Sequence, residues 1–162
     1  MERLWTPWRM EYIKAAGAED EPGCIFCDLP ARDDDEKNRI LARSDKAFVI
    51  LNAFPYNAGH LMVAPFRHVG ELEELSAEEL ADLDALLQRS IRALKEEYAP
   101  QGFNIGMNLG RVAGAGIPDH VHWHVVPRWN GDTNFMPVVG QTKVLPELLQ
   151  ETYQRLRPAY AG

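Results

Sequence analysis

Residues 118–128 read P-D-H-V-H-W-H-V-V-P-R, and three of the five histidines in the chain stand at every second position of this apolar run: His120, His122 and His124. Successive side chains of an extended strand point to opposite faces, so the spacing predicts a strand over residues 120–127 with the imidazoles in one row. The side chains that then face a hydrophobic core are Val121, Trp123 and Val125. A neutral imidazole can serve as a nucleophile, a proton carrier or a metal ligand. The row therefore indicates a reactive face, although a polar strand face or a fortuitous metal patch would have the same spacing.

Upstream of this run, two apolar segments predict a hairpin. Residues 47–52 (A-F-V-I-L-N) and 60–65 (H-L-M-V-A-P) flank the turn sequence P-Y-N-A-G, which is typical of a link between two strands. Residues 102–109 (G-F-N-I-G-M-N-L) alternate again and predict a further strand. A glycine-rich loop, R-V-A-G-A-G, follows that strand and leads to the histidine run.

A long amphipathic helix is predicted to begin after Ser76 and to end near Pro100. Ser76 and Glu79 form a capping box, and apolar side chains follow at three- and four-residue steps: Leu80, Leu83, Leu87, Ile91 and Leu94. A second helix is predicted over residues 145–156, with these side chains facing inward: Leu148, Leu149, Tyr153 and Leu156. Hairpin-linked strands around one long helix indicate an antiparallel sheet with helices packed on it, which is an α+β fold.

The composition is that of a globular protein. The chain has 162 residues, of which 46% are hydrophobic and 25% charged, and this predicts one domain over residues 1–162. There is no long apolar run and no secretory signal pattern, so we expect a cytoplasmic protein without membrane contact. The net charge of -7 argues against a nucleic-acid partner. A phosphorylated small substrate could still be held by local donors such as Arg111, Arg128 and Lys143.

The two ends of the chain are less regular than its middle. Residues 1–23 are interpreted as an arm, residues 24–128 as the core, and residues 129–162 as a C-terminal extension that includes the second helix. The arm carries two tryptophans that are expected to dock on the domain or on a partner subunit: Trp5 and Trp8. The acidic stretch 32–38 is interpreted as a solvated loop.

The run H-V-H-W-H-V-V-P-R resembles the signature of the histidine triad (HIT) nucleotidyl hydrolases and transferases. The resemblance continues through V-I-L-N, P-Y-N-A-G-H-L-M-V-A-P and G-F-N-I-G-M-N-L-G, and it covers residues 24–128. The end sequences L-W-T-P-W-R and W-N-G-D-T-N-F are similar to the branch that includes bacterial diadenosine tetraphosphate phosphorylases. The resemblance implies a HIT-like fold with an antiparallel sheet of about five strands, one long packed helix and a C-terminal helix. It also implies a homodimer.

The resemblance assigns roles to individual residues. His122 would attack the α-phosphorus of a nucleoside polyphosphate and form a nucleotidyl-imidazole intermediate. His124 would hydrogen-bond the α-phosphate or the bridging oxygen and help the leaving group to depart. Asn108 matches the asparagine that holds the reacting phosphate, and Asn52 matches the residue that binds the ribose hydroxyls, although an asparagine at a strand end also caps turns. His60 is interpreted as a structural histidine near the triad.

The chain departs from the family pattern just before the first histidine of the row. Many members have Gly-Gln-Ser or Gly-Gln-Thr there, whereas residues 115–117 are Ala-Gly-Ile, so two side-chain donors to the leaving phosphate are missing. The backbone N–H groups of Gly114 and Gly116 are expected to approach phosphate oxygens instead. Thr133 and Asn134 are candidate donors to distal phosphates, although G-D-T-N is also ordinary turn composition.

A metal site is also implied. In a cytosolic protein the pair Cys24 and Cys27 indicates metal binding or free thiols more than a disulfide. In zinc-containing branches of the family, a Cys-x-x-Cys pair, a histidine after the 60–65 strand and the first histidine of the triad make one tetrahedral site. His68 and His120 fill the last two positions here. We expect structural zinc; without it the cysteines would pack as small apolar side chains and His120 would support the site by hydrogen bonds.

The resemblance implies an enzyme that cleaves a dinucleoside polyphosphate, above all diadenosine tetraphosphate, through nucleotidyl-His122. Inorganic phosphate or water would be the acceptor. Hydrolysis of adenosine phosphoramidates is an alternative, and the missing Gln-Ser pair counts against it. A nucleotide-binding regulatory protein without catalysis is a further alternative, and a zinc-binding scaffold is a poorer one. A pure binder or scaffold has no need of a correctly spaced nucleophile.

Overall fold

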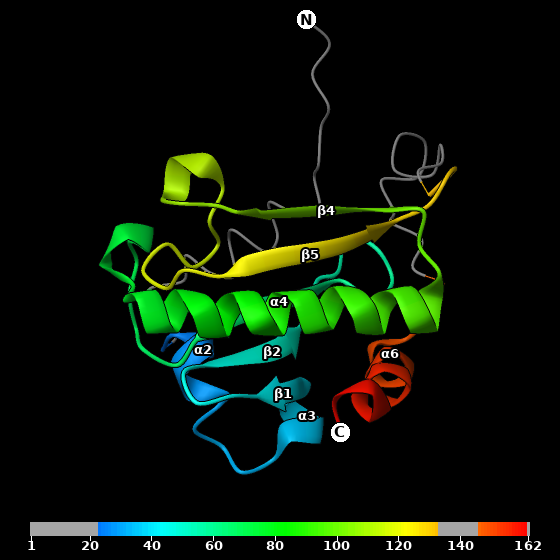
Figure 1. Cartoon of the computed structure of the whole chain (residues 1–162), viewed down its shortest axis with the longest axis horizontal. Helices are drawn as coiled ribbons and strands as arrows, with labels where there is room; N and C mark the ends of the chain where they lie inside the picture. The colour runs from blue at the N-terminus through cyan, green and yellow to red at the C-terminus, as the bar shows by residue number, and fades with distance from the viewer. Residues whose placement is uncertain (1–22, 133–145, 162) are drawn as a thin grey trace, which may run out of the picture.

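The computed structural model describes residues 23–132 and 146–161, and Figure 1 shows their arrangement. They form a five-stranded antiparallel sheet in the order β1-β2-β3-β5-β4. Its strands are β1 Ile40–Arg43, β2 Ala47–Leu51, β3 Leu61–Pro65, β4 Gly102–Met107 and β5 Trp123–Arg128. The α-helices are α2 Ile25–Asp28, α3 Asp35–Asn38, α4 Ala77–Tyr98 and α6 Leu149–Leu156, and the 3-10 turns are η1 Leu72–Glu74, η2 Arg111–Ala113 and η3 Arg157–Tyr160. The predicted α+β fold is confirmed.

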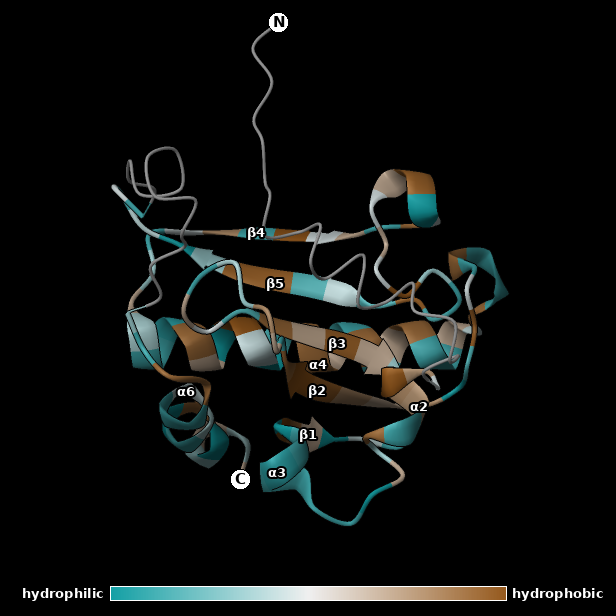
Figure 2. Cartoon of the chain, turned by 180° about the vertical axis from the view of Figure 1, so that it is seen from behind, coloured by the Kyte–Doolittle hydropathy of each residue, from teal (hydrophilic) through white to brown (hydrophobic). Residues whose placement is uncertain are grey.

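The sheet has an apolar layer on each of its two faces. Helix α4 runs along one face in Figure 1, and the opposite face is turned toward the viewer in Figure 2, where the central strands are strongly hydrophobic. Alternation assigns Val49 and Leu51 to the α4 side, whereas Phe48 and Ile50 pack with Phe26 of α2 on the other side. All side chains of β2 and β3 are therefore buried, and the two strands form a rigid centre from which β5 is positioned.

The predicted hairpin is present, with Val49 opposite Val63 in the β2–β3 register. Helix α4 begins after Ser76, as predicted, and its capping box with Glu79 is formed. Its buried stripe differs from the prediction, because Leu80 is exposed. The side chains that are buried along α4 are Glu79, Leu83, Leu86, Ser90, Ala93 and Leu94. The small side chain of Ser90 is useful there, since its hydroxyl accepts a hydrogen bond from Tyr160 of η3 and ties the C-terminal segment to α4.

One strand was missed and two further expectations were wrong. Strand β1 was not predicted, because four residues are too few to show a period. The stretch expected to be a solvated loop contains α3, which is capped by the side chain of Asp34. Leu148 is exposed, because it precedes α6. The buried side chains of α6 are Thr152, Tyr153 and Leu156.

Several parts of the chain lie outside the described residues, including Trp5, Trp8, Lys143 and the first residues of the predicted second helix. The division into arm, core and extension stays a prediction. Among the described helices, none has the length and apolar character needed to cross a membrane.

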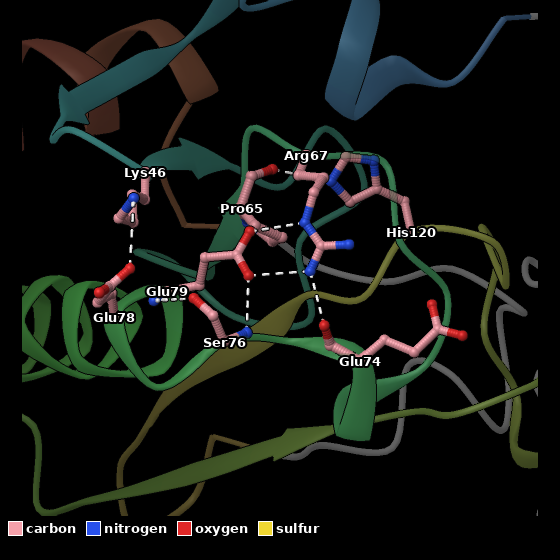
Figure 3. A network of polar contacts seen from close by, with 8 residues as sticks. All are labelled: Lys46, Pro65, Arg67, Glu74, Ser76, Glu78, Glu79 and His120. Carbon is pink, nitrogen blue, oxygen red and sulfur yellow. Dashed lines mark hydrogen bonds and ion pairs between the residues drawn. The ribbon is translucent and has the colours of Figure 1, made fainter.

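The start of α4 is joined to the end of β3 by an ion pair, shown in Figure 3. The guanidinium of Arg67 donates to both carboxylate oxygens of Glu79, at 2.8 and 2.9 Å, and the N–H of Ser76 donates to the same carboxylate at 2.8 Å. The hydrogen bonds from Arg67, and then those from Ser76, lower the pKa of Glu79 to about 2. The carboxylate is thus stabilised in its charged form.

Replacing Glu79 by glutamine is expected to lower the free energy of unfolding at pH 7 by about 1 to 2 kcal/mol. Because the folded-state pKa of Glu79 is depressed, its contribution is complete above the ordinary pKa of 4.5 and is lost as the pH falls toward about 2. Urea unfolding at pH 7 and pH 3 measures the difference. Glu78→Gln is the matched control, since the side chain of Glu78 is 80% exposed. An equal loss for the two variants at pH 7 would contradict the prediction.

Candidate active site and metal-binding cluster

The histidine row lies partly outside the strand in which it was predicted. Strand β5 begins at Trp123, so only His124 of the three histidines lies within it. The reason is on the neighbouring strand, where the β3–β5 register pairs Met62 with His124 and β3 ends at Pro65. A proline has no N–H group to extend the ladder. The chain before β5 bonds elsewhere instead, with the N–H of Val121 donating to the carbonyl of Val69 at 2.8 Å.

The expected division of faces is nevertheless confirmed. Val121 and Val125 are buried in the core on the α4 side, and Trp123 packs against that core. The rings of His122 and His124 lie on the other side, with their centroids 4.9 Å apart.

The imidazole of His122 has a defined orientation. Its Nδ1 lies 2.8 Å from the backbone carbonyl of His120, and because a carbonyl only accepts, Nδ1 must carry the proton. The neutral ring then has its free electron pair on Nε2. The ring is 5% exposed and lies 4.6 Å from the ring of Phe26, and this burial lowers the pKa of His122. The residue is thus a neutral imidazole with one available nitrogen.

The proton of His124 is also placed by its neighbours. His60 is buried, and its Nδ1 accepts a hydrogen bond from the N–H of Tyr56 at 3.0 Å, so its Nε2 carries the proton. That nitrogen lies 3.0 Å from Nδ1 of His124 and donates to it. The side-chain nitrogen of Asn52 also lies 3.4 Å from Nε2 of His60. Both nitrogens then carry hydrogen, and this longer contact leaves the assignment of the His60 proton unchanged. His124 therefore carries its own proton on Nε2.

A cavity of about 410 Å³ opens beside His124 on this side of the sheet. Asn108 lies in its wall near His124, and its amide is 3.4 Å from the carbonyl of Gly114. The other polar side chains of the wall are Tyr56, Asn57, Asn104 and Arg128. The structure thus brings Asn108 and His124 to one cavity, with the ring of His122 next to that of His124.

The other predicted nucleotide-binding residues lie in different surroundings, and their contacts with a nucleotide stay a prediction. The side-chain carbonyl of Asn52 accepts a hydrogen bond from the N–H of Phe54 at 2.9 Å, as in a capped turn. The N–H of Gly114 donates to the carbonyl of Arg111 at 3.0 Å. Gly116 lies in the loop that precedes the histidine row. Thr133 and Asn134 lie outside the described residues.

A second group of side chains lies at the start of the row. One cysteine caps the start of α2 and the other lies within that helix. They meet two histidines, and one ligand atom from each residue lies within 4.8 Å of all the others: Cys24, Cys27, His68 and His120. The Nδ1 of His120 is 3.2 Å from the sulfur of Cys24, and the Nδ1 of His68 is 3.4 Å from that of Cys27. The four predicted ligands are thus brought together.

The geometry of this cluster fits a single tetrahedral ion. Zinc bonds to sulfur and to imidazole nitrogen imply a separation of about 3.6 Å between the two donor atoms, close to the distances in the cluster. The Nε2 of His120 lies 2.8 Å from the carbonyl of Pro65 and must donate to it, which leaves the electron pair on Nδ1 pointing at the sulfurs. Burial lowers the pKa of His120 to about 4, so the ring stays neutral, as a ligand must.

Several residues of the site were missed or undervalued in the sequence. His60 was interpreted as structural, and its bond to His124 joins positions 64 residues apart. Phe26 lies against the rings of both His120 and His122, although α2 is too short to show a period. Arg128 is paired with Asp132 at the far end of the cavity. Two features of the sequence could have indicated these residues. One is the histidine that follows N-A-G, and the other is the spacing of four residues between Arg128 and Asp132, which suits an ion pair.

Comparison with known proteins agrees with this geometry. Residues 34–131 match the model of the HIT domain family. The AP-4-A phosphorylase of Mycobacterium tuberculosis is 43% identical over 167 residues, which cover 99% of this chain and 85% of that protein. The adenosine 5′-monophosphoramidase of Schizosaccharomyces pombe is 33% identical over 107 residues, which cover 66% of this chain and 75% of that protein.

The fold is similar to that of a solved structure, a Zn-bound histidine triad family protein from Mycobacterium smegmatis. The TM-score is 0.68 and the sequence identity 31%, with 86% of this chain and 94% of that chain covered.

Proposed function

The chain belongs to the HIT family. On that premise we propose that it is an enzyme that cleaves a dinucleoside polyphosphate through a nucleotidyl-His122 intermediate. The proposed substrate is diadenosine tetraphosphate. The observation that carries the proposal is the orientation of His122, whose Nδ1 is held by the carbonyl of His120 so that Nε2 is free. The 43% identity to a protein named AP-4-A phosphorylase supports the choice of substrate.

In the first step, Nε2 of His122 attacks the α-phosphorus of the bound nucleotide. Neutral imidazole is a good nucleophile, and it leaves readily once it has become an imidazolium, so one slow displacement is divided into two faster ones. His124 donates a hydrogen bond from its Nε2–H to the bridging oxygen that departs and so stabilises the charge that forms there. Asn108, in the wall of the same cavity, hydrogen-bonds the reacting phosphate.

His60 has the role of a positioning residue for this hydrogen bond. Replacing His60 by leucine is expected to reduce kcat about tenfold, because His124 would no longer be held in the tautomer that donates from Nε2. A purely structural role would lower kcat for all substrates alike. We expect a larger loss of kcat for the phenyl ester of AMP than for its 4-nitrophenyl ester, because phenolate is the poorer leaving group and depends more on stabilisation by His124. Equal losses for the two esters would contradict this role.

The acceptor of the second step is proposed to be inorganic phosphate, with water as the alternative. The test is to incubate the protein with diadenosine tetraphosphate, with and without phosphate, and to separate the nucleotides. ADP that forms only with phosphate supports phosphorolysis, and AMP in both incubations identifies a hydrolase. Absence of turnover would favour a nucleotide-binding regulatory protein.

Hydrolysis of adenosine phosphoramidates is the second candidate activity. This activity would use the same nucleophile, and the similarity to a yeast adenosine 5′-monophosphoramidase supports it as a candidate. The sequence Ala-Gly-Ile at 115–117 argues for the polyphosphate, because the Gln-Ser donors of many family members are missing. Comparing kcat/KM for the two substrates decides between them.

We also propose that the cluster of Cys24, Cys27, His68 and His120 holds a structural zinc ion. Four protein ligands fill a tetrahedral site and leave no position for water, so the ion would brace the fold and take no part in the chemistry. Thiolate ligands require a reducing compartment, which agrees with a cytoplasmic location.

The last part of the proposal is a homodimer formed along β4. This strand lies at the edge of the sheet, and exposed apolar side chains occur on and beside it: Ile105, Leu109 and Val112. An unpaired edge with apolar neighbours favours pairing with a second copy. Sedimentation equilibrium is expected to give twice the chain mass, and Ile105→Lys is expected to shift the protein toward the monomer.

A further inference from the structure

The cavity beside His124 is longer than the reacting phosphate requires. It continues along β4 and β5 from His124 past Val126 to Arg128. Alternation places these three side chains on the same side of β5 as His122, and the cavity extends in the direction that leads away from His122. The far end of the cavity is not needed for the attack by His122 or for the hydrogen bond from His124.

The far end of the cavity is held rigidly. Arg128 donates from Nε and Nη2 to the two carboxylate oxygens of Asp132, at 2.6 and 2.9 Å. Asn57 donates to the same carboxylate at 2.8 Å and to the carbonyl of Pro127 at 3.0 Å. The hydrogen bond from Arg128 holds the pKa of Asp132 well below its usual range. Arg128 is therefore fixed before any ligand arrives, which reduces the entropy cost of binding.

Asn104 adds a donor with a known direction. Its Oδ1 accepts a hydrogen bond from Nη1 of Arg128 at 2.5 Å, and since a guanidinium only donates, the amide cannot be turned round. The NH₂ group of Asn104 is consequently the end that remains for a ligand. The three bonds of Arg128 also leave some of its N–H donors unused. The far end thus presents donors, which suits an anion with several acceptor oxygens.

The strand next to His124 leaves room for such an anion. Gly106 pairs with His124 in the β4–β5 register, and a Cβ atom placed on Gly106 would meet no heavy atom within 4 Å. A glycine inside a strand weakens the strand, and it commonly marks a close approach of a ligand. Gly106 lines the cavity, so the space above it is part of the path from His124 to Arg128.

The direction of this path is that of the departing group. In an in-line displacement the leaving oxygen lies on the far side of phosphorus from the attacking Nε2 of His122, and the Nε2–H of His124 donates a hydrogen bond to that oxygen. The group attached to it therefore extends past His124 along the cavity. The acceptor of the second step must attack phosphorus from the side that the leaving group has vacated.

We propose that the cavity between His124 and Arg128 is a single subsite used twice, first by the triphosphate end of the leaving nucleotide and then by inorganic phosphate as the acceptor. This inference rests on the proposed function and specifies how it discriminates phosphate from water. Asn104 and Arg128 are the residues that determine this specificity, because their fixed donors bind an anion and give water no comparable advantage.

Both steps balance within this geometry. In the first, the electron pair on Nε2 of His122 forms the bond to the α-phosphorus, and the bond from phosphorus to the bridging oxygen breaks with its electron pair on that oxygen. The Nε2–H of His124 stabilises the new charge on this oxygen by a hydrogen bond, and ATP departs as an anion. In the second, a phosphate oxygen bonds to phosphorus, the phosphorus–nitrogen bond breaks with its electron pair returning to His122, and the remaining proton of the phosphate is released to solvent. The products from diadenosine tetraphosphate are ATP and ADP.

The test uses the full chain and separates the two steps. Nucleotidyl-enzyme is formed from adenosine 5′-phosphoramidate, whose leaving group is too small to reach Arg128, and is then mixed with increasing inorganic phosphate. The ratio of ADP to AMP gives the phosphate concentration at which half of the intermediate goes to each product. We expect Asn104→Ala to raise this concentration about tenfold and Asn104→Asp about a hundredfold, since one removes a donor and the other adds repulsion.

A steric pair of variants tests the path itself. Gly106→Val should block it and lower cleavage of diadenosine tetraphosphate at least about tenfold relative to the phosphoramidate, a difference of about 1.4 kcal/mol in the activation free energy. Ala81→Val is the control, because it adds the same kind of side chain at an exposed position of α4, which packs on the other face of the sheet. That variant should preserve the ratio of the two activities, with the oligomeric state checked for both.

The possible outcomes separate this inference from the function on which it rests. Failure of the unmodified protein to form nucleotidyl-enzyme would overturn the proposed function. If the intermediate forms but phosphate competes with water equally well in both Asn104 variants, the subsite is overturned and the function survives. Equal losses in Gly106→Val and Ala81→Val would also overturn the subsite.

Discussion

Replacement of His122 by asparagine is expected to lower the rate of diadenosine tetraphosphate cleavage by about 10⁴-fold or more. The electron pair of an amide nitrogen is delocalised into its carbonyl, so the variant has no nucleophile where Nε2 of His122 lies. The asparagine also removes the imidazolium that leaves in the second step. Steady-state rates, together with mass spectrometry of acid-quenched protein, measure the loss of turnover and of the adenylyl adduct.

The control for this variant is nucleotide binding. The ring of His122 packs on Phe26, but the donors that hold phosphate in our proposal come from other residues, such as Asn108 and Asn104. Binding of AMP should therefore fall by less than about tenfold. Turnover within tenfold of the parent protein, or an adduct that persists on another residue, would refute the assignment of His122 as the nucleophile.

The face of β5 could be predicted from the sequence because it depends on a local rule. Alternation assigned Val121 and Val125 to the core, and the same rule placed His122 and His124 together on the other side. The capping box of Ser76 and Glu79 was predictable for the same reason, since both residues lie within one turn of α4. Such features need only the order of neighbouring residues.

The remaining features depend on contacts between distant residues. The beginning of β5 at Trp123 is set by Pro65 on a different strand. The tautomer of His124 is set by His60, and the far end of the cavity requires Asn104 of one strand to meet Arg128 of the next. The sequence contains these residues, but no local pattern indicates that they meet.

Replacement of Cys24 by serine is expected to abolish zinc binding and to lower the free energy of unfolding by at least about 3 kcal/mol. The cluster joins α2 to His68 after β3 and to His120 before β5, so its loss releases three segments that are distant in sequence. A serine hydroxyl is a poor substitute for a thiolate ligand. Metal analysis of the purified protein should give about one zinc per chain before the change and less than about a tenth after it.

Ile25→Ser is the matched control, because Ile25 lies between the two cysteines on α2 and is 38% exposed. It should retain the metal and unfold at nearly the same temperature as the parent, whereas Cys24→Ser should match the parent treated with a chelator. Zinc retained in Cys24→Ser, or a parent protein whose unfolding is insensitive to the chelator, would refute the site.

Loss of the metal should also weaken the active site without touching its reacting atoms. The cluster fixes His120, and the backbone carbonyl of His120 is the acceptor that keeps the proton of His122 on Nδ1. When His120 is released, the neutral His122 ring can turn or exchange tautomers. The free electron pair of Nε2 then faces the substrate in only a fraction of the molecules. We therefore expect Cys24→Ser, where it remains folded, to lower the rate of nucleotidyl-enzyme formation while AMP still binds. An unchanged rate in a zinc-free, folded variant would show that His122 is oriented by the protein chain alone.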